Sequence, residues 1–456
     1  MRLISTRDAR QEAPLRTAVL GGPAPNGGLY LPVDLPAFSR DELRSLRSKP
    51  FTATAEYLAH RILAPTVEGD AVRRMVESAF DFAVPLIRID ESTWILELFH
   101  GPTGSFKDFG ARFLARLLAI LRDPNDGPVV ILVATSGDTG GAVADAVRGL
   151  EGVRAVVLYP QGRLSSVQLR QIQVPAVRNG DRPDPAGAPA QGVVPVEVRG
   201  SFDDCQRMVK DVLDKPGPGV DAILTSANSV NVGRLIPQTF YYLYGWNELP
   251  DAGRSDLTIS VPSGNLGNLT AGILARGMGL PVERFIAASN ENAAMTRFFD
   301  SGNWPDGDTL ETLSSAMDVA RPNNLERLVS LFGGDAEALR RVIAATVHTD
   351  EEVLETIDRI HRERGYLMDP HTAVGYLGLE ERRRATGEEG PGIILATADP
   401  AKFPTTIERA IGRPPPRRPD WEEEGISRSG APREAEESTI VTDPDSDALR
   451  EILRKA

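Results

Sequence analysis

The stretch Leu96-Glu-Leu-Phe-His-Gly-Pro-Thr-Gly-Ser-Phe-Lys-Asp-Phe-Gly-Ala-Arg112 decides how this chain is interpreted. The apolar run Trp94–Phe99 predicts a short buried strand, and the Gly and Pro residues of His100–Gly104 predict a turn. Apolar residues at helical spacing predict a helix over Phe106–Leu121. Lys107 therefore lies where a loop becomes a helix, facing the space above the strand ends.

A lysine in this position is suited to covalent chemistry. Burial disfavours the ammonium form, so Lys107 is expected to lose its proton readily. A neutral amine is the form that makes a Schiff base. The alternative is an ordinary lysine at a helix start, paired with Asp108 or Glu97.

Four more polar segments, three of which contain glycine, follow predicted strands or lead into helices. Ligands of parallel sheets bind outside the carboxyl ends of the strands, where such segments lie. The segments are Ala134–Gly141, Ala227–Arg234, Pro262–Asn268 and Ala396–Phe403.

Together these motifs resemble the threonine synthase family, which are pyridoxal-phosphate (PLP) enzymes of the tryptophan-synthase-β-like fold, also called fold type II. The resemblance runs from Ser5-Thr6-Arg7 to about Phe403. It implies a lyase that converts O-phospho-L-homoserine and water to L-threonine and phosphate, the last step of threonine biosynthesis. Other segments that carry it are Gly22–Pro32, Phe202–Cys205, Met317–Val319, Asn324–Arg327 and Asp369–Gly375.

Strand and helix patterns alternate from Trp94 onward, which predicts an α/β fold with parallel sheets. The resemblance implies two parallel-sheet-rich domains, residues 91–225 and 226–413, with a mainly helical N-terminal domain, residues 1–90. Residues 414–456 are expected to be a partly disordered tail, and Gln173–Gly192 an irregular loop. Within the tail, Asp447–Arg454 could form a last helix. The predicted sheet strands are Val129–Ala134, Ala155–Tyr159, Val194–Val198, Ala222–Thr225, Leu257–Val261, Arg284–Ala288 and Ile393–Thr397.

The segment after strand Leu257–Val261 is a candidate phosphate cradle. A glycine-rich turn at a helix N-terminus presents backbone N–H groups to an anion, although a plain strand-to-helix turn would look alike. The resemblance assigns the cofactor phosphate to Gly264, Asn265, Leu266, Gly267 and Asn268.

Two further loops are expected to hold the substrate. The resemblance implies that Thr135, Ser136 and Thr139 bind its α-carboxylate and that Asp138 approaches the 3′-oxygen of the cofactor. Asp138 stands where many fold relatives carry Asn, and a simple helix cap is the alternative function of this loop. Ser229, Asn231 and Arg234 are expected to bind the substrate phosphate, for which a guanidinium is well shaped. The alternative for Arg234 is a solvated helix residue.

The segment Ala396–Phe403 is expected to lie beside the cofactor ring. The resemblance places the hydroxyl of Thr397 opposite the pyridine nitrogen. The family usually has His where this chain has Asp399, which puts the role of that His in doubt. Asp399 is expected to point along the departing loop and cap a helix starting near Lys402. His371 is expected to line the site or an interdomain contact.

Net charge, cysteine and histidine content and the N-terminal sequence bear on the kinds of partner, metal site and location that are expected. A net charge of −13 argues against nucleic-acid binding and anionic membranes, and no stretch is long enough to cross a bilayer. Cys205 is the only cysteine, and the five histidines show no ligand spacing, so no metal site is expected. The N-terminus has no signal-peptide pattern, so a cytoplasmic protein is expected, as a monomer or homodimer.

Two alternatives to threonine synthase activity stay open at this point. One is a PLP-dependent lyase or deaminase acting on a related amino acid. The other is a non-catalytic protein of the same fold that binds PLP or a phosphorylated ligand. Lys107, the glycine-rich loops and Arg234 favour an enzyme, whereas Asp399 is the one departure that favours the binding protein.

Overall fold

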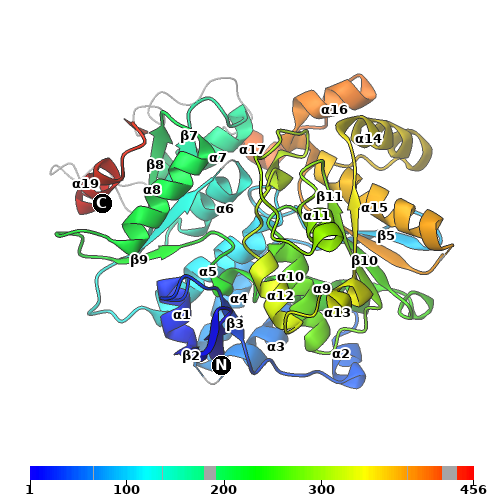
Figure 1. Ribbon diagram of the computed structural model, residues 1–456, viewed down its shortest axis with the longest axis horizontal. Coiled ribbons are helices and arrows are strands. Elements are labelled where there is room, and N and C mark those ends of the chain that lie inside the picture. The colour runs from blue at the N-terminus through cyan, green and yellow to red at the C-terminus, as the bar shows by residue number, and fades with distance from the viewer. Residues whose placement is uncertain (65, 136, 179–191, 388, 424–438, 456) are drawn as a thin grey trace.

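The computed structural model describes residues 1–455 apart from 65, 136, 179–191, 388 and 424–438. Two larger sheets lie next to each other, and the N-terminal residues pack below them (Figure 1). This arrangement confirms the predicted α/β class with parallel-rich sheets.

The first larger sheet has six strands in the order β12-β11-β10-β13-β5-β4. All neighbours are parallel except the pair β4–β5. Because β10, β13 and β5 are adjacent and parallel, the three loops that leave their carboxyl ends meet at one edge. The strands are β4 (Leu86–Arg88), β5 (Thr93–Glu97), β10 (Thr258–Pro262), β11 (Arg284–Ser289), β12 (Ile343–Val347) and β13 (Gly392–Ala396).

The second larger sheet has five parallel strands in the order β14-β8-β7-β6-β9. Strand β6 is buried on both faces, which explains its unbroken apolar sequence. Val129, Ile131 and Val133 face one core, whereas Val130 and Leu132 face another. The strands are β6 (Val129–Ala134), β7 (Val153–Pro160), β8 (Val193–Val198), β9 (Ile223–Ser226) and β14 (Ile440–Thr442).

Helices cover both larger sheets. On the five-stranded sheet, α8 begins at a capping box in which Ser201 and Asp204 exchange hydrogen bonds. Helix α15 packs across β10, β11 and β13 of the six-stranded sheet. The helices are α5 (Lys107–Leu121), α6 (Asp138–Ala146), α7 (Ser166–Arg178), α8 (Phe202–Asp214), α9 (Gln238–Glu248), α10 (Gly267–Gly277), α11 (Ala294–Ser301), α12 (Leu325–Leu331), α13 (Ala336–Val342), α14 (Asp350–Arg364), α15 (Pro370–Thr386) and α16 (Pro404–Ile411).

The N-terminal part combines a small antiparallel sheet with four helices. Its apolar residues belong to the same continuous core as α5 and α9, so it is not packed as a separate body. Phe51 of α3, for example, contacts Phe109 and Tyr244 edge-to-face. The elements are β1 (Arg2–Ser5), β2 (Asp8–Pro14), β3 (Tyr30–Pro32), α1 (Leu15–Gly21), α2 (Arg40–Ser45), α3 (Phe51–Leu63) and α4 (Gly69–Ala79).

One sequence-based expectation differs from the structure, and another is not tested by it. Gln173–Gly192 was expected to be loop, but α7 continues to Arg178. All but one of the Pro and Gly residues of this stretch lie beyond Arg178, so the signal for a loop begins later than was expected. Residues 179–191 lie outside the described part. The divisions at residues 90, 225 and 413 stay a prediction, although β5 pairs with β13 and not with a strand of the 91–225 segment.

The C-terminal tail is folded where the structure describes it. Helix α17 (Pro419–Glu423) lies near the loop before Lys107, and β14 adds an edge strand to the five-stranded sheet. Helix α19 (Ser446–Lys455) packs on α8 through Leu449 and Leu453, which confirms the predicted last helix. The expected disorder falls partly on residues 424–438, outside the described residues.

Candidate active site

The loop that leads to Lys107 is held by the carboxylate of Asp108. This carboxylate accepts hydrogen bonds from the Thr103 hydroxyl at 2.6 Å and from the Thr103 backbone N–H at 3.0 Å. Burial raises the pKa of Asp108 to about 6. The loop also bonds to the segment after β13, because Phe106 N–H donates to the Thr397 carbonyl at 2.9 Å. The lysine therefore starts α5 from a rigid turn.

Lys107 is half-buried, and its amine makes no hydrogen bond or ion pair within the described part of the chain. The alternative partners are engaged elsewhere: Asp108 binds Thr103, and Glu97 binds His100 and Tyr366. Burial lowers the pKa of Lys107 to about 8, and the Arg234 and Lys402 cations act in the same direction against Asp138. Roughly a tenth of the amine is thus neutral at pH 7, whereas less than a thousandth of an ordinary lysine with a pKa of about 10.4 would be.

The loop after β6 brings Asp138 to the same place. The Thr135 hydroxyl accepts hydrogen bonds from Gly137 N–H and Gly140 N–H, each at 3.0 Å, which closes the loop onto the start of α6. Asp138 lies in the first turn of α6, and Gly137, not Asp138, is its N-cap residue. Ser136 lies outside the described residues.

These residues line a small hollow of about 20 Å³. Its far side is formed by Ser315 and Ala316 of the turn η3 (Ser315–Met317). A larger surface hollow of about 700 Å³, beside Arg7 and Trp304, holds none of the predicted site residues. The small hollow is lined by Lys107, Thr135, Gly137, Asp138, Thr139, Gln168, Ser315 and Ala316.

The segment after β10 has the geometry of an anion cradle. Helix α10 begins at Gly267 directly after Leu266, which has φ 58° and gives no side-chain cap. The first N–H groups of a helix have no partner in the preceding turn, so they are available to an anion. Gly264 allows the backbone at Met317 to pack closely against this segment, because a Cβ at position 264 would lie only 2.7 Å from Met317 Cα.

The hydrogen bonding of the Asn268 side-chain amide shows whether the start of α10 is suited to a cofactor phosphate. Its side-chain oxygen accepts hydrogen bonds from Tyr241 at 2.6 Å and Tyr242 at 2.8 Å. Its buried Nδ2 atom, in contrast, has no partner among the residues that the structure describes. An unsatisfied buried donor beside free helix N–H groups fits an anionic ligand.

The loop after β9 was expected to bind the substrate phosphate. The side chain of Ser229 accepts a hydrogen bond from Asn265 Nδ2 at 2.9 Å, so this loop touches the cradle. Asn231 is fully buried and donates to the carbonyls of Val19 at 2.9 Å and Ser226 at 3.1 Å, which joins the N-terminal part to the loop. In this structure Asn231 therefore supports the loop, and substrate contact by it stays a prediction.

Arg234 is a buried cation, not the solvated residue of the alternative interpretation. Its Nη1 donates to the Ala227 carbonyl, while its Nε has no partner. Burial lowers the pKa of this guanidinium to about 10. A desolvated guanidinium with an unpaired donor is suited to an anion such as phosphate.

Two residues follow β13 at the remaining edge of the site. Thr397 is buried, and its hydroxyl makes no hydrogen bond within the described residues. Asp399 accepts from Ala401 N–H at 2.8 Å and so caps the turn η4 (Pro400–Lys402), which confirms capping but one turn earlier than the helix expected near Lys402. Burial raises the pKa of Asp399, whose carboxylate lies 3.6 Å from Arg418.

His371 positions the wall of the hollow. Its Nε2 accepts a hydrogen bond from Ala316 N–H at 3.1 Å, and its Nδ1 lies 2.7 Å from the Asp369 carboxylate. Because Nε2 accepts, Nδ1 carries the proton and donates to Asp369. The side chain is thus a site-wall support, in line with the expectation.

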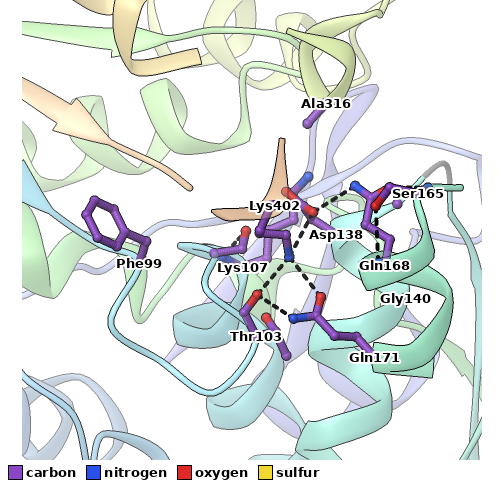
Figure 2. Close-up of polar contacts among 12 residues, drawn as sticks. Phe99, Thr103, Lys107, Asp138, Gly140, Ser165, Gln168, Gln171, Ala316 and Lys402 are labelled. Carbon is purple, nitrogen blue, oxygen red and sulfur yellow. Dashed lines mark hydrogen bonds and ion pairs between the residues drawn. The ribbon is translucent and has the colours of Figure 1, made fainter. Parts of the chain in front are cut away.

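Sequence analysis did not identify several residues of the site. Gln168 and Gln171 lie on α7, and Lys402 is a fully buried cation (Figure 2). Arg418 and Trp421 of the tail bind the loop before Lys107: Trp421 Nε1 donates to the Pro102 carbonyl at 2.8 Å, and Arg418 donates to the Phe99 carbonyl at 3.1 Å. Lys402 lies in the segment Ala396–Phe403, which the sequence did single out. The sequence of the tail, in contrast, gave no sign that Arg418 and Trp421 contact the loop before Lys107.

The fold and the site define a PLP-dependent enzyme. A half-buried lysine of lowered pKa, a glycine cradle at a helix start and the unsatisfied Asn268 amide fit that cofactor. The family model described as "Pyridoxal-phosphate dependent enzyme" matches residues 83–398. Models described as "Threonine synthase N terminus" and "Threonine synthase, C-terminal" match residues 2–80 and 372–451.

Relatives agree over nearly the whole chain. A threonine synthase of Serratia marcescens is 39% identical over 414 residues, which is 91% of each chain. The crystal structure of threonine synthase from Escherichia coli has a TM-score of 0.86 at 35% identity and covers 99% of each chain. A PLP-bound threonine synthase from Brucella melitensis has a TM-score of 0.85 at 31% identity, covering 100% of this chain and 99% of that one. The chain belongs to the threonine synthase family.

Two other observations bear on function. No helix within the described residues is both long enough and apolar enough to span a membrane. The same residues contain no group of three or more His, Cys, Asp or Glu side chains placed to hold a metal ion.

Proposed function

We propose that this chain converts O-phospho-L-homoserine and water to L-threonine and phosphate with pyridoxal phosphate as cofactor. Family membership supports the reaction class, and the chemistry of the site supports the substrate. The observation that carries the proposal is the unpaired Lys107 amine, which faces Asp138 and has two separate anion-binding regions nearby. A phosphorylated substrate and a phosphorylated cofactor need two such regions.

The cofactor phosphate is assigned to the start of α10. Backbone N–H groups of Gly264, Asn265, Leu266, Gly267 and Asn268, with the unsatisfied Asn268 amide, would hold it. The free hydroxyl of Thr397 would face the ring nitrogen, and Asp138 the 3′-oxygen. When it carries the substrate amine in place of the Lys107 amine, pyridoxal phosphate would withdraw electrons from the substrate carbon atoms next to that amine, and Lys107 would be free to move protons.

The substrate is assigned to the opposite side of the hollow. The start of α6, with Thr135, Ser136 and Thr139, would bind its carboxylate, since a helix N-terminus favours an anion. The loop of Ser229, Asn231 and Arg234 would bind its phosphate. Lys107 Nζ would then accept and return protons at the α and β carbons, for which its lowered pKa is suited.

Product analysis tests the proposal. Purified protein is incubated with O-phospho-L-homoserine, and threonine, 2-oxobutyrate and phosphate are measured. Threonine with equimolar phosphate supports the proposal, whereas 2-oxobutyrate would assign a lyase or deaminase. No phosphate release, with bound cofactor that borohydride fixes to Lys107, would indicate a binding protein.

The setting of the enzyme is part of the proposal. The one cysteine, Cys205, is buried and unpaired, which suits a reducing compartment such as the cytoplasm. A monomer or a homodimer is proposed for the assembly.

A further inference from the structure

Lys402 is a second lysine of the site, and it is completely enclosed. Its Nζ lies 3.0 Å from Asp138 Oδ1, 2.7 Å from the Thr103 carbonyl and 2.9 Å from Gln171 Oε1 (Figure 2). The ammonium group donates hydrogen bonds to the Thr103 carbonyl and to Gln171, and it forms an ion pair with the Asp138 carboxylate. A buried charge is costly unless it is paired in this way, so the site is built around a charged Lys402.

Asp138 is shared between the two lysines. Its Oδ1 atom forms an ion pair with Lys402 and accepts a hydrogen bond at 3.0 Å from Gln168 Nε2, while Lys107 lines the same hollow. The carboxylate is thus the only anion placed between Lys107 and Lys402 among the described groups that act on Lys107. Whichever lysine Asp138 neutralises decides how easily the other one loses its proton.

The charged groups around this pair come from several elements. Arg234 of the turn η1 (Val232–Arg234) and Lys402 of η4 repel a proton on Lys107, and Asp138 of α6 attracts it. His371 of α15 also acts on Asp138. Burial works to raise the pKa of Asp138, but the Lys402 and Lys107 cations outweigh it, so that pKa lies below its usual range. Asp138 is therefore charged, and its main bonded partner is Lys402.

We propose that Lys402 is a positioning residue that neutralises Asp138, so that the Asp138 carboxylate does not hold a proton on the nitrogen of Lys107. The inference rests on the proposed function in taking Lys107 as the reactive amine. The bonded Lys402–Asp138 pair is neutral as a unit. It therefore presents Lys107 with hydrogen-bonding oxygen atoms but little net charge, as an asparagine amide in place of Asp138 would.

This proposal predicts that substitutions of Lys402 and of Asp138 shift the protonation of the Lys107 nitrogen in opposite directions. Lys402→Met leaves Asp138 with Lys107 as its only ammonium partner, so the Lys107 nitrogen should hold its proton to higher pH. Asp138→Asn removes the attraction and leaves Lys402 charged, so the nitrogen should lose its proton at lower pH. The double variant has neither charge and should resemble the unchanged protein.

The test is a pH titration of the protein with its cofactor bound. The visible absorbance of the bound cofactor changes when the Lys107 nitrogen gains or loses a proton, which a purely structural role would not move. We expect Lys402→Met to raise the midpoint by about one pH unit or more, the size of shift that one neighbouring opposite charge produces. Asp138→Asn should lower it, and the double variant should return to within roughly half a unit.

Two controls make the result specific. Lys402→Arg keeps the charge and should keep the midpoint, and Lys210→Met removes an exposed lysine of α8 and should change nothing. An unmoved midpoint in Lys402→Met, or a double variant that behaves like Lys402→Met, overturns the proposal. If Lys402→Met does not fold, a midpoint in Asp138→Asn that fails to fall overturns it. The midpoint does not depend on which product forms, so a failure of the proposed function shows separately in product analysis.

Discussion

The C-terminal tail holds the loop that carries Lys107, and Trp421→Ala tests how strongly. The Trp421 indole is 2% exposed and donates its N–H to the Pro102 carbonyl at 2.8 Å. Arg418 lies over the indole at 4.7 Å from its centroid. The substitution removes the ring, the hydrogen bond and the platform for Arg418.

The size of the effect follows from the buried surface. An indole buries about 200 Å², worth about 5 kcal/mol at roughly 25 cal/mol per Å², which is an upper bound. Measured replacements of buried Trp by Ala cost about 3–5 kcal/mol. A loss of about 3 kcal/mol shifts the equilibrium between docked and released tail by roughly 100-fold.

Hydrogen–deuterium exchange measures this release. Peptides that hold residues 418–423 and 99–106 should exchange faster in Trp421→Ala, by up to roughly 100-fold for the first, because exchange follows the opened population. Trp304→Ala is the matched control, since Trp304 is 57% exposed. Unchanged exchange in Trp421→Ala, or an equal rise in both variants, would refute the reasoning.

The remaining predictions concern the site itself. Lys107→Ala should abolish turnover and the borohydride-fixed cofactor, and normal activity in that variant would remove the basis of the assignment. Arg234→Ala should weaken O-phospho-L-homoserine far more than the cofactor, by about 1.5–3 kcal/mol for one charge-assisted contact, measured as KM against cofactor retention with Arg234→Lys as control; the reverse order would mean that the two phosphate regions are exchanged. Thr397→Val should lower kcat/KM strongly while Asp399→His changes it only a few-fold, because Asp399 caps a turn and contacts the tail; the opposite ranking contradicts this placement. Since burial lowers the pKa of Lys107 to about 8, cofactor attachment to stripped protein should be fastest above pH 8 and slow as pH falls through it, and a rate that is flat from pH 6 to 9 would contradict the neutral amine.

The sequence predicted most strands of the two larger sheets because their apolar runs are bounded by turn residues, but it did not predict β4, β12 or β14. Val129–Ala134 was predicted with the bounds of β6. Strand β12 was not predicted, because Ile343–Val347 directly follows the helix α13 without a turn to separate them. The extent of α7 was underestimated because the whole stretch Gln173–Gly192 was taken as an irregular loop from its Pro and Gly content, although most of these residues lie beyond Arg178.

For the site, the sequence predicted which loops meet but not which side chains pair. Glycine-rich segments at strand ends can be recognised locally, whereas the ion pair between Lys402 of η4 and Asp138 of α6 joins residues far apart in the sequence. The position of Arg418 beside Asp399 was equally out of reach. It supplies a reason why an acidic residue is tolerated there, since its charge is met by the tail.

The contact between Trp421 and Pro102 spans 319 residues of sequence. A ribosome that adds about 5–20 residues per second needs roughly 15–60 s to make that length of chain. During this interval the loop before Lys107 lacks its contact with Trp421, and β5 cannot pair with β13 until that strand has been made. The newly made protein thus gains its complete reactive loop only after Trp421 has been added. The order in which the chain is synthesised therefore delays the assembly of the loop that carries Lys107 until its tail contacts can form.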